Sequence, residues 1–174
     1  GWRLFNKTWR DFKFSLFERI KFSNNALVLN FSSSFVYDDP TTDILFEYSK
    51  KTSTNHYGLS KLNFENVLTD IFESSTVHLL SLRLAVVLVK DVKYNFMSQW
   101  LNSIKSEKSI VLSNPNSLFN ACIYSEDIFQ FFLKCMKQPI TKHLICNLSS
   151  KNPIKVIDAA KLMMKTLNSS VPII

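Results

Sequence analysis

The feature that most constrains the fold of this chain is a set of short, continuous apolar runs that alternate with helical patterns. The first run, residues 26–31, follows the turn residues 23–25 and ends at three serines. A second run, residues 77–89, is interrupted by Arg83. Apolar runs of strand length, bounded by turn residues, are typical of strands buried on both faces of a parallel sheet.

The segments between these runs carry apolar residues at spacings of three and four, which predicts amphipathic helices. The expected helices are residues 6–21, 55–73, 94–107, 125–137 and 154–168. Further strands are expected at residues 109–112, 119–124 and 143–148. Because strand and helix alternate throughout, the sequence favours an α/β sandwich with a largely parallel sheet.

The size and charge of the chain narrow the class of protein. With 174 residues, 46% of them hydrophobic, it can bury the core of one globular domain. No apolar stretch approaches the roughly 18 to 20 residues of a membrane span, so we expect a soluble protein. The net charge of +7 is scattered in pairs of lysines, which disfavours nucleic-acid binding and suits a phosphate-bearing ligand.

Glycine, cysteine and histidine usage excludes several kinds of site. The sequence holds two glycines, Gly1 and Gly58, too few for a Gly-rich phosphate-binding turn. The cysteines are odd in number and widely spaced, so we expect buried thiols in a reducing compartment. No zinc-type spacing links them to the histidines, and no metal site is expected. The chain opens on Gly1 without a signal-peptide pattern, and we expect further residues upstream.

A tyrosine and a lysine stand four residues apart at the start of the expected helix 55–73. Tyr57 and Lys61 would therefore lie on one face of that helix and reach into the same cleft. A nearby cation favours phenolate over phenol, which makes Tyr57 a candidate acid or base. The alternative is a half-buried tyrosine beside a solvated lysine, because this short motif has many chance matches.

Two polar features interrupt the apolar runs. Ser32, Ser33 and Ser34 end the first strand, and open α/β sheets bind their ligands at the carboxyl ends of strands. The alternative is a serine-rich turn. Arg83 lies inside the second run, where a buried charge must be paired. A structural salt bridge is the favoured interpretation of Arg83.

Taken in order, these motifs resemble the extended short-chain dehydrogenase/reductases, in their NAD-dependent sugar epimerase/dehydratase branch. Residues 31–37, Phe-Ser-Ser-Ser-Phe-Val-Tyr, are similar to the family's strand that ends in serines and Val-Tyr. Residues 57–61, Tyr-Gly-Leu-Ser-Lys, are similar to its Tyr-Gly-x-Ser-Lys. Weaker matches follow at residues 82–84, 95–96 and 123–128, so the resemblance spans roughly residues 27–160.

The resemblance implies roles for several residues. Tyr57 would be the general acid or base on a sugar hydroxyl, Lys61 would bind the nicotinamide ribose, and Ser33 would bond the reacting oxygen. The implied cofactor is NAD or NADP and the implied substrate is a nucleotide sugar. Further contacts are implied for the cofactor from Ser32 and Ala85, and for the substrate from Ser34, Asn95 and Asn120.

The resemblance also implies a Rossmann-like three-layer sandwich that is incomplete at its N-terminal side, with a small substrate-binding portion. Residues 1–89 would be the catalytic part of the NAD(P)-binding domain. Residues 90–174 would be mostly substrate-binding, with residues 119–138 packing back on the Rossmann sheet. A cytoplasmic protein is implied, with a homodimer formed through the helix that bears Tyr57.

The chain departs from the family pattern in ways that support a second hypothesis. The Gly-rich turn and the acidic residue that reads the adenine ribose precede the matched region in the family, and we expect no tight NAD binding by these 174 residues alone. Ala85, Val89 and Tyr124 replace the family's Pro, Gly and His. The first hypothesis is an NAD(P)-dependent epimerase, dehydratase or reductase; the alternative is a non-catalytic relative that acts as a binding or regulatory module.

Overall fold

The chain divides into two compact units. The computed structural model describes residues 22–23, 25–37, 44–89, 95–119, 122–137 and 143–174. The first unit comprises Gly1–Ala85 with Phe129–Leu148, and the second comprises Val86–Ile128 with Ser149–Ile174. The helix expected at residues 6–21 lies outside the described residues. No helix among the described residues is both long and apolar enough to cross a membrane.

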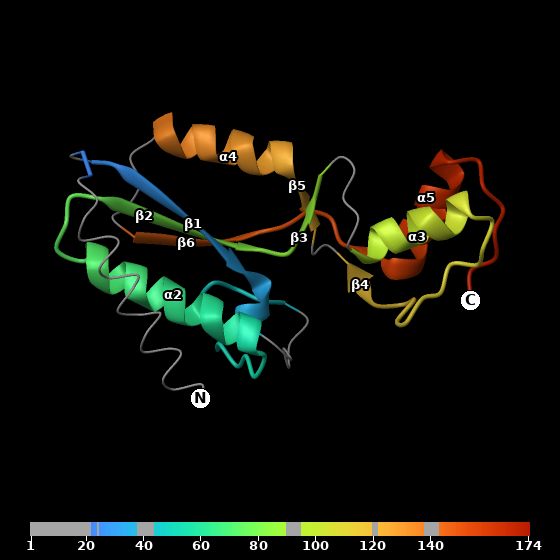
Figure 1. Ribbon diagram of the computed structural model, residues 1–174, viewed down its shortest axis with the longest axis horizontal. Coiled ribbons are helices and arrows are strands. Elements are labelled where there is room, and N and C mark those ends of the chain that lie inside the picture. Colours follow the sequence, from blue (N-terminus) through green and yellow to red (C-terminus); the bar gives the residue numbers. More distant parts are fainter. Residues whose placement is uncertain (1–21, 24, 38–43, 90–94, 120–121, 138–142) are drawn as a thin grey trace. The chain divides into compact units, whose positions relative to one another are not determined.

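The first unit is built on a three-stranded parallel sheet in the order β1-β2-β6 (Figure 1). The strands are β1 (Leu27–Ser33), β2 (His78–Leu84) and β6 (His143–Leu148). Ser33 is opposite Leu84, and Leu84 is opposite Leu148. The three strands therefore end at the same level, and their carboxyl ends form one edge at which a site can be assembled.

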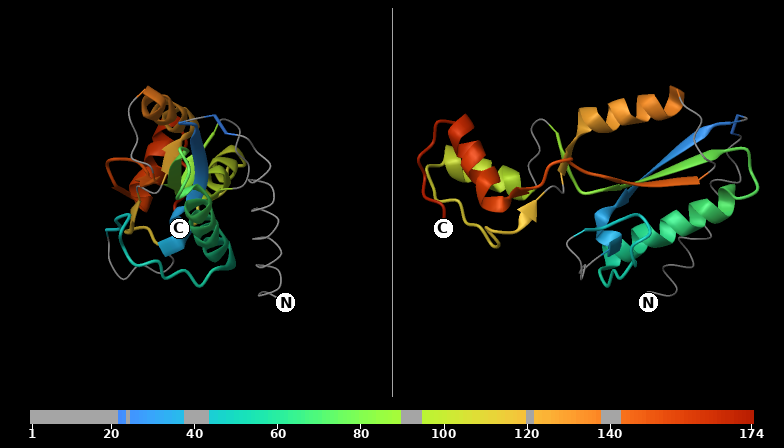
Figure 2. Two further views of the ribbon diagram at one scale, coloured as in Figure 1. Left: turned by 90° about the vertical axis from the view of Figure 1, so that its left-hand side faces the viewer. Right: turned by 180° about the vertical axis from the view of Figure 1, so that it is seen from behind.

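Helices cover both faces of this sheet. Helix α2 (His56–Phe72) lies on one face, and α4 (Ser125–Lys137) lies on the other (Figures 1 and 2). The central strand β2 is buried at all but its first residue, and its four leucines suit that position. Its buried polar residues, Ser81 and Arg83, therefore need hydrogen-bond partners. The expected Rossmann-like three-layer sandwich with a parallel sheet is confirmed.

The contact between α2 and the sheet is a compact apolar cluster. Its buried members are Leu68 and Phe72 of α2, Leu79 of β2, and Val77 in the preceding turn. Phe22 packs edge-on against Phe72, with the ring centres 5.3 Å apart. Full burial of a Leu or Phe side chain contributes about 1.5 to 3 kcal/mol, so this cluster holds α2 firmly on the sheet.

The amino end of α2 lies against the turn that follows β1. This turn, η1 (Ser34–Tyr37), is a short 3-10 helix. Asn55 caps α2, because its side chain accepts a hydrogen bond of 2.8 Å from the Tyr57 backbone N–H. A Cβ atom at Gly58 would overlap the Phe35 carbonyl oxygen and the Ser53 hydroxyl. Glycine at position 58 therefore permits the close approach of α2 and η1.

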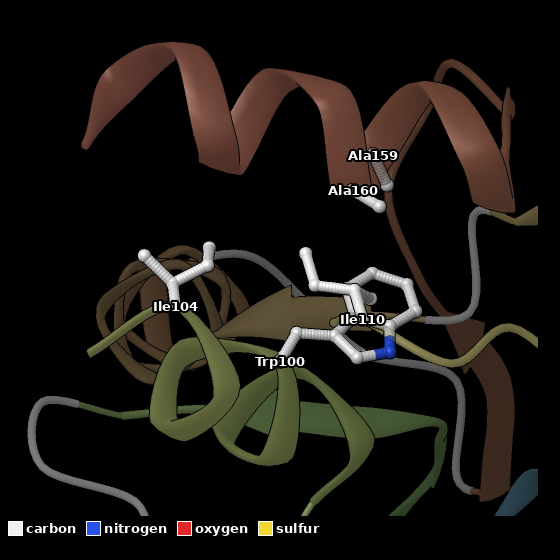
Figure 3. Packing of buried hydrophobic residues seen from close by; sticks show 5 residues of the cluster. All are labelled: Trp100, Ile104, Ile110, Ala159 and Ala160. Carbon is white, nitrogen blue, oxygen red and sulfur yellow. The ribbon is translucent and has the colours of Figure 1, made fainter. Parts of the chain in front are cut away.

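The second unit is organised around two helices, α3 (Phe96–Lys105) and α5 (Val156–Thr166). Trp100 of α3 faces the small residues Ala159 and Ala160 of α5, and Ile110 lies next to the Trp100 indole (Figure 3). Ile104 of α3 belongs to the same buried cluster. The alanines leave room for the large indole between the helices.

Short strands complete the second unit. β3 (Val86–Leu88) pairs in parallel with β5 (Cys122–Tyr124), and β4 (Leu118–Phe119) pairs antiparallel with β7 (Ile154–Lys155).

Three expected strands differ from the structure. The run 77–89 breaks at Ala85 into β2 and β3, which pair in different sheets. The strand expected at 119–124 is divided between β4 and β5, and at 109–112 the structure shows only an isolated bridge from Ile110 to Ile173. Strand propensity reports a half-buried environment and not the identity of the partner, so sequence alone could not locate these breaks.

We expect Gly58→Ala to destabilise the first unit. A methyl group would favour the helix by up to about 1 kcal/mol, but forcing it against a backbone carbonyl costs typically 1 to 3 kcal/mol. Asn63→Ala, at an exposed position of the same helix, is the matched control and should be neutral or stabilising. Thermal unfolding followed by circular dichroism distinguishes the two, and an equally stable Gly58→Ala variant would contradict the close approach.

Candidate functional site

Helix α2 brings together the phenol and the ammonium group predicted from the sequence. Lys61 Nζ lies 5.5 Å from the centre of the Tyr57 ring. The same ammonium donates a hydrogen bond of 2.8 Å to the Phe31 carbonyl oxygen of β1. The Tyr57 ring is 52% exposed and packs edge-on against Phe35, with ring centres 5.9 Å apart. The pair thus lies at the carboxyl end of β1, with the phenol open to solvent.

The three serines after the apolar run of β1 have different environments. Ser33, the last residue of β1, is buried, and its Oγ accepts a hydrogen bond of 3.2 Å from the Phe35 backbone N–H. This is a serine turn, and it leaves the Ser33 hydroxyl proton for another acceptor. Ser34 begins η1 and is partly buried. Ser32 is buried and donates to Glu65 Oε1 over 2.5 Å, so a contact from Ser32 to a cofactor stays a prediction.

A buried ion pair lies beneath these residues. Arg83 of β2 bonds Glu65 of α2 through two nitrogens, Nη2 to Oε2 at 2.7 Å and Nε to Oε1 at 3.0 Å. The two side chains are 1% and 4% exposed. Burial by itself lowers the pKa of Arg83, but hydrogen bonds to Glu65 and Tyr37 and the charge of Glu65 outweigh it, so the pKa is raised. The structural salt bridge expected for Arg83 is confirmed.

The ion pair extends into a polar network along the carboxyl edge of the sheet. Arg83 Nη1 donates to the Tyr37 hydroxyl at 2.6 Å and to the Glu47 carbonyl at 2.9 Å. The Tyr37 hydroxyl donates to Asn147 Oδ1 at 2.8 Å, and the Asn147 backbone N–H donates to Glu47 Oε1 at 2.8 Å. The network therefore joins β2, η1, β6 and the segment around Glu47.

Sequence reasoning missed Glu65, although a signal was present. Glu65 stands four residues after Lys61 and is followed by the apolar residues Val67 and Leu68. A carboxylate on the apolar face of a helix needs a buried partner, and Arg83 was already expected to need one. The two requirements together identify the pair.

The remaining candidates for substrate and cofactor contacts are Asn95, Ala85 and Asn120. Asn95 caps α3, since its Oδ1 accepts a hydrogen bond of 2.7 Å from the Ser98 N–H. Its Nδ2 is buried and has no partner in the part of the chain that the structure describes. Ala85 is partly buried between β2 and β3, and Asn120 lies outside the described residues.

The second unit contains an open pocket of about 420 Å³. Its lining comes mainly from α3 and α5 and is mostly apolar. The lining residues are Met97, Leu101, Cys122, Ser150, Asn152, Ile154, Ala159, Leu162, Met163, Thr166 and Leu167. None of the site residues expected from the sequence lines it.

The cysteines are reduced and partly buried. Cys122, Cys135 and Cys146 are free thiols. Burial raises the pKa of Cys122 and Cys135, and burial followed by the nearby Glu47 and Cys135 raises the pKa of Cys146. Over the described residues, no three His, Cys, Asp or Glu side chains are grouped so as to hold a metal ion.

The fold and the site define a Rossmann-like protein with a serine, a tyrosine and a lysine near the end of its first strand. The model of the NAD dependent epimerase/dehydratase family matches residues 10–148. This match covers most of the chain, so the chain belongs to the NAD-dependent epimerase/dehydratase family. A search of curated proteins found no match.

Solved structures with a similar fold include several UDP-sugar epimerases. A UDP-glucuronic acid 4-epimerase from Bacillus cereus, in complex with UDP-glucuronic acid and NAD, is similar with a TM-score of 0.79 at 14% identity, over 97% of this chain and 53% of that one. A UDP-N-acetylglucosamine 4-epimerase from Methanobrevibacter ruminantium M1 has a TM-score of 0.73 at 18% identity, over 84% of this chain and 48% of that one. A UDP-galactose 4-epimerase has a TM-score of 0.70 at 18% identity, over 84% of this chain and 49% of that one. The chain spans about half the length of these proteins.

We expect the three thiols to react slowly in the folded chain. A raised pKa leaves less thiolate at pH 8, and partial burial limits access, so both effects slow attack on Ellman's reagent relative to glutathione. In denaturant all three should react at once, which provides the control. Three thiols that react as fast as glutathione in the folded chain would contradict the described burial.

Proposed function

We propose that this chain is the catalytic and substrate-side part of an NAD(P)-dependent enzyme that acts on a nucleotide sugar, as an epimerase, dehydratase or reductase. The observation that carries the proposal is the position of Lys61, 5.5 Å from the Tyr57 ring centre and bonded to the end of β1. Membership of the epimerase/dehydratase family supports it, as do structural neighbours that are UDP-sugar epimerases.

The proposed chemistry assigns one task to each of three residues. Tyr57 moves a proton to or from a sugar hydroxyl, which its half-exposed phenol can reach. Lys61 holds a positive charge beside that phenol, 5.5 Å from the centre of its ring. Ser33 offers its hydroxyl proton to the reacting oxygen, whose negative charge grows during the reaction. A bound nicotinamide would accept or deliver the hydride.

The residues fit one end of such a cofactor and not the other. An ammonium group has three N–H donors, and the Phe31 carbonyl takes one of those of Lys61, which leaves donors for the hydroxyls of a ribose. The pyrophosphate end normally needs a Gly-rich turn. Gly58, the glycine within the described residues, is packed against η1. We therefore propose that NAD or NADP is held jointly with a dinucleotide-binding half outside this chain, with Ser32 and Ala85 as further contacts.

The substrate contacts are also proposals. The Nδ2 of Asn95 is buried and has no partner among the described residues, so it is a donor suited to a phosphate or sugar oxygen. Ser34 at the start of η1, and Asn120, are the further substrate contacts that we propose. The net charge of +7 would attract a phosphate-bearing substrate. A homodimer through α2 and a cytoplasmic location are also proposed. Residues 90–174 would be mostly substrate-binding, with residues 119–138 packing back on the Rossmann sheet.

A non-catalytic relative that acts as a binding or regulatory module is the second candidate. Ala85, Val89 and Tyr124, which replace the Pro, Gly and His of the family, favour it. Such a module would bind a nucleotide sugar or a partner without any hydride chemistry.

The variant Tyr57→Phe tests whether the protein is an enzyme or a non-catalytic module. In a polypeptide extended at its amino end by a dinucleotide-binding half, we expect turnover of UDP-sugars to fall by about 10² to 10⁴, the usual contribution of a general acid or base. Binding of NADH, followed by its fluorescence, should change by less than about twofold because the ring remains. Tyr48→Phe, at a 79% exposed tyrosine, is the matched control.

The outcomes are distinct. A Tyr57→Phe enzyme that remains active would refute the assignment of Tyr57. A wild-type protein that binds UDP-sugars and NADH without turnover would favour the non-catalytic module.

A further inference from the structure

The Lys61 ammonium group bonds the sheet, although the Glu65 carboxylate lies one helical turn further along α2. Lys61 and Glu65 are four residues apart on α2, a spacing at which opposite charges ordinarily attract. Among the described residues, however, Glu65 forms its ion pair with Arg83. Lys61 instead bonds the Phe31 carbonyl of β1.

Glu65 is already engaged, because its carboxylate accepts three hydrogen bonds from Arg83 and Ser32. Oε1 accepts hydrogen bonds from Arg83 Nε at 3.0 Å and from Ser32 Oγ at 2.5 Å. Oε2 accepts from Arg83 Nη2 at 2.7 Å. The planar guanidinium bonds both oxygens at once through two N–H groups in a fixed geometry, whereas an ammonium group is a point charge without that planar fork.

Removal of Arg83 would reverse this arrangement. Glu65 is 3% exposed, and a buried carboxylate without its partner must either take up a proton or pair with another cation within reach. Lys61 is one helical turn away, with a long and flexible side chain. It would turn from the Phe31 carbonyl towards Glu65 and leave its position beside Tyr57.

We propose that Arg83, together with Ser32, is a positioning residue that keeps Glu65 occupied, so that the Lys61 ammonium stays beside Tyr57 at the end of β1. The importance of that position for a reaction rests on the proposed function of Tyr57 and Lys61. The placement of Lys61 itself can be measured without any turnover.

Trace acetylation of the 174-residue chain, read by mass spectrometry, measures this placement. The readout is the labelling of Lys61 relative to the exposed Lys50 of the same molecule. In Arg83→Met we expect this ratio to fall about three- to fivefold, since an amine paired with a carboxylate loses its proton less readily. In Glu65→Gln/Arg83→Met the competing charge is absent, and the ratio should return to within about twofold of the wild-type value.

Two serine variants test the same idea without leaving a charge unpaired. Ser32→Ala frees part of Glu65 Oε1 and should lower the ratio by about twofold, because Arg83 still holds the carboxylate. Ser81→Ala is the matched control: its hydroxyl is equally buried but bonds Asn30 within the sheet, at 3.0 Å, and the ratio should not change. If Arg83→Met does not fold, as judged by circular dichroism, the comparison of these two serine variants decides.

A folded Arg83→Met variant with the wild-type ratio would overturn the inference. So would a double variant that stays as low as Arg83→Met, because a purely structural ion pair would not make Lys61 recover when Glu65 loses its charge. Should Tyr57→Phe prove active while the labelling follows our expectation, the proposed chemistry fails and the positioning role of Arg83 stands.

Discussion

The buried pair of Glu65 and Arg83 is the interaction on which the rest of the first unit depends. Placing two charges in a protein interior carries a desolvation cost of several kcal/mol per ion, and only good geometry compensates for it. Here the guanidinium bonds both carboxylate oxygens, and Ser32 and Tyr37 supply further hydrogen bonds. Helix α2 is thereby joined to β1 and β2 at a defined height and rotation.

This arrangement explains why the candidate site lies where it does. Lys61 and Glu65, one turn apart on α2, are bonded to the consecutive residues Phe31 and Ser32 of β1. Tyr57, one turn further towards the amino end, is then carried to the level at which β1 ends, beside Phe35. The close packing at Gly58 contributes to the same positioning, because any larger residue would push the start of α2 away from η1. A site of this kind depends on a rigid helix and a rigid strand held at fixed separation.

Much of the architecture could be predicted from local pattern. The bounds of α4 and β6 are those expected, and α2 differs from expectation by one residue at each end. The need of Arg83 for a partner followed from its apolar surroundings. The sequence did not predict which strands pair with one another. The break at Ala85 and the separate pairing of β4 and β5 are set by strands far away in the sequence. Local apolar content is the same whichever partner a strand has.

The sequence by itself determined the alternation of buried strands and amphipathic helices, the family, and the one-turn spacing of Tyr57 and Lys61, because each is a property of neighbouring residues. Only the tertiary structure decided that Ser32 faces Glu65, that Lys61 bonds Phe31 and that Arg83 pairs with Glu65. These contacts join residues 18 to 33 positions apart. Their formation depends on how α2 is rotated on the sheet, which is set by packing and buried charge rather than by any local preference.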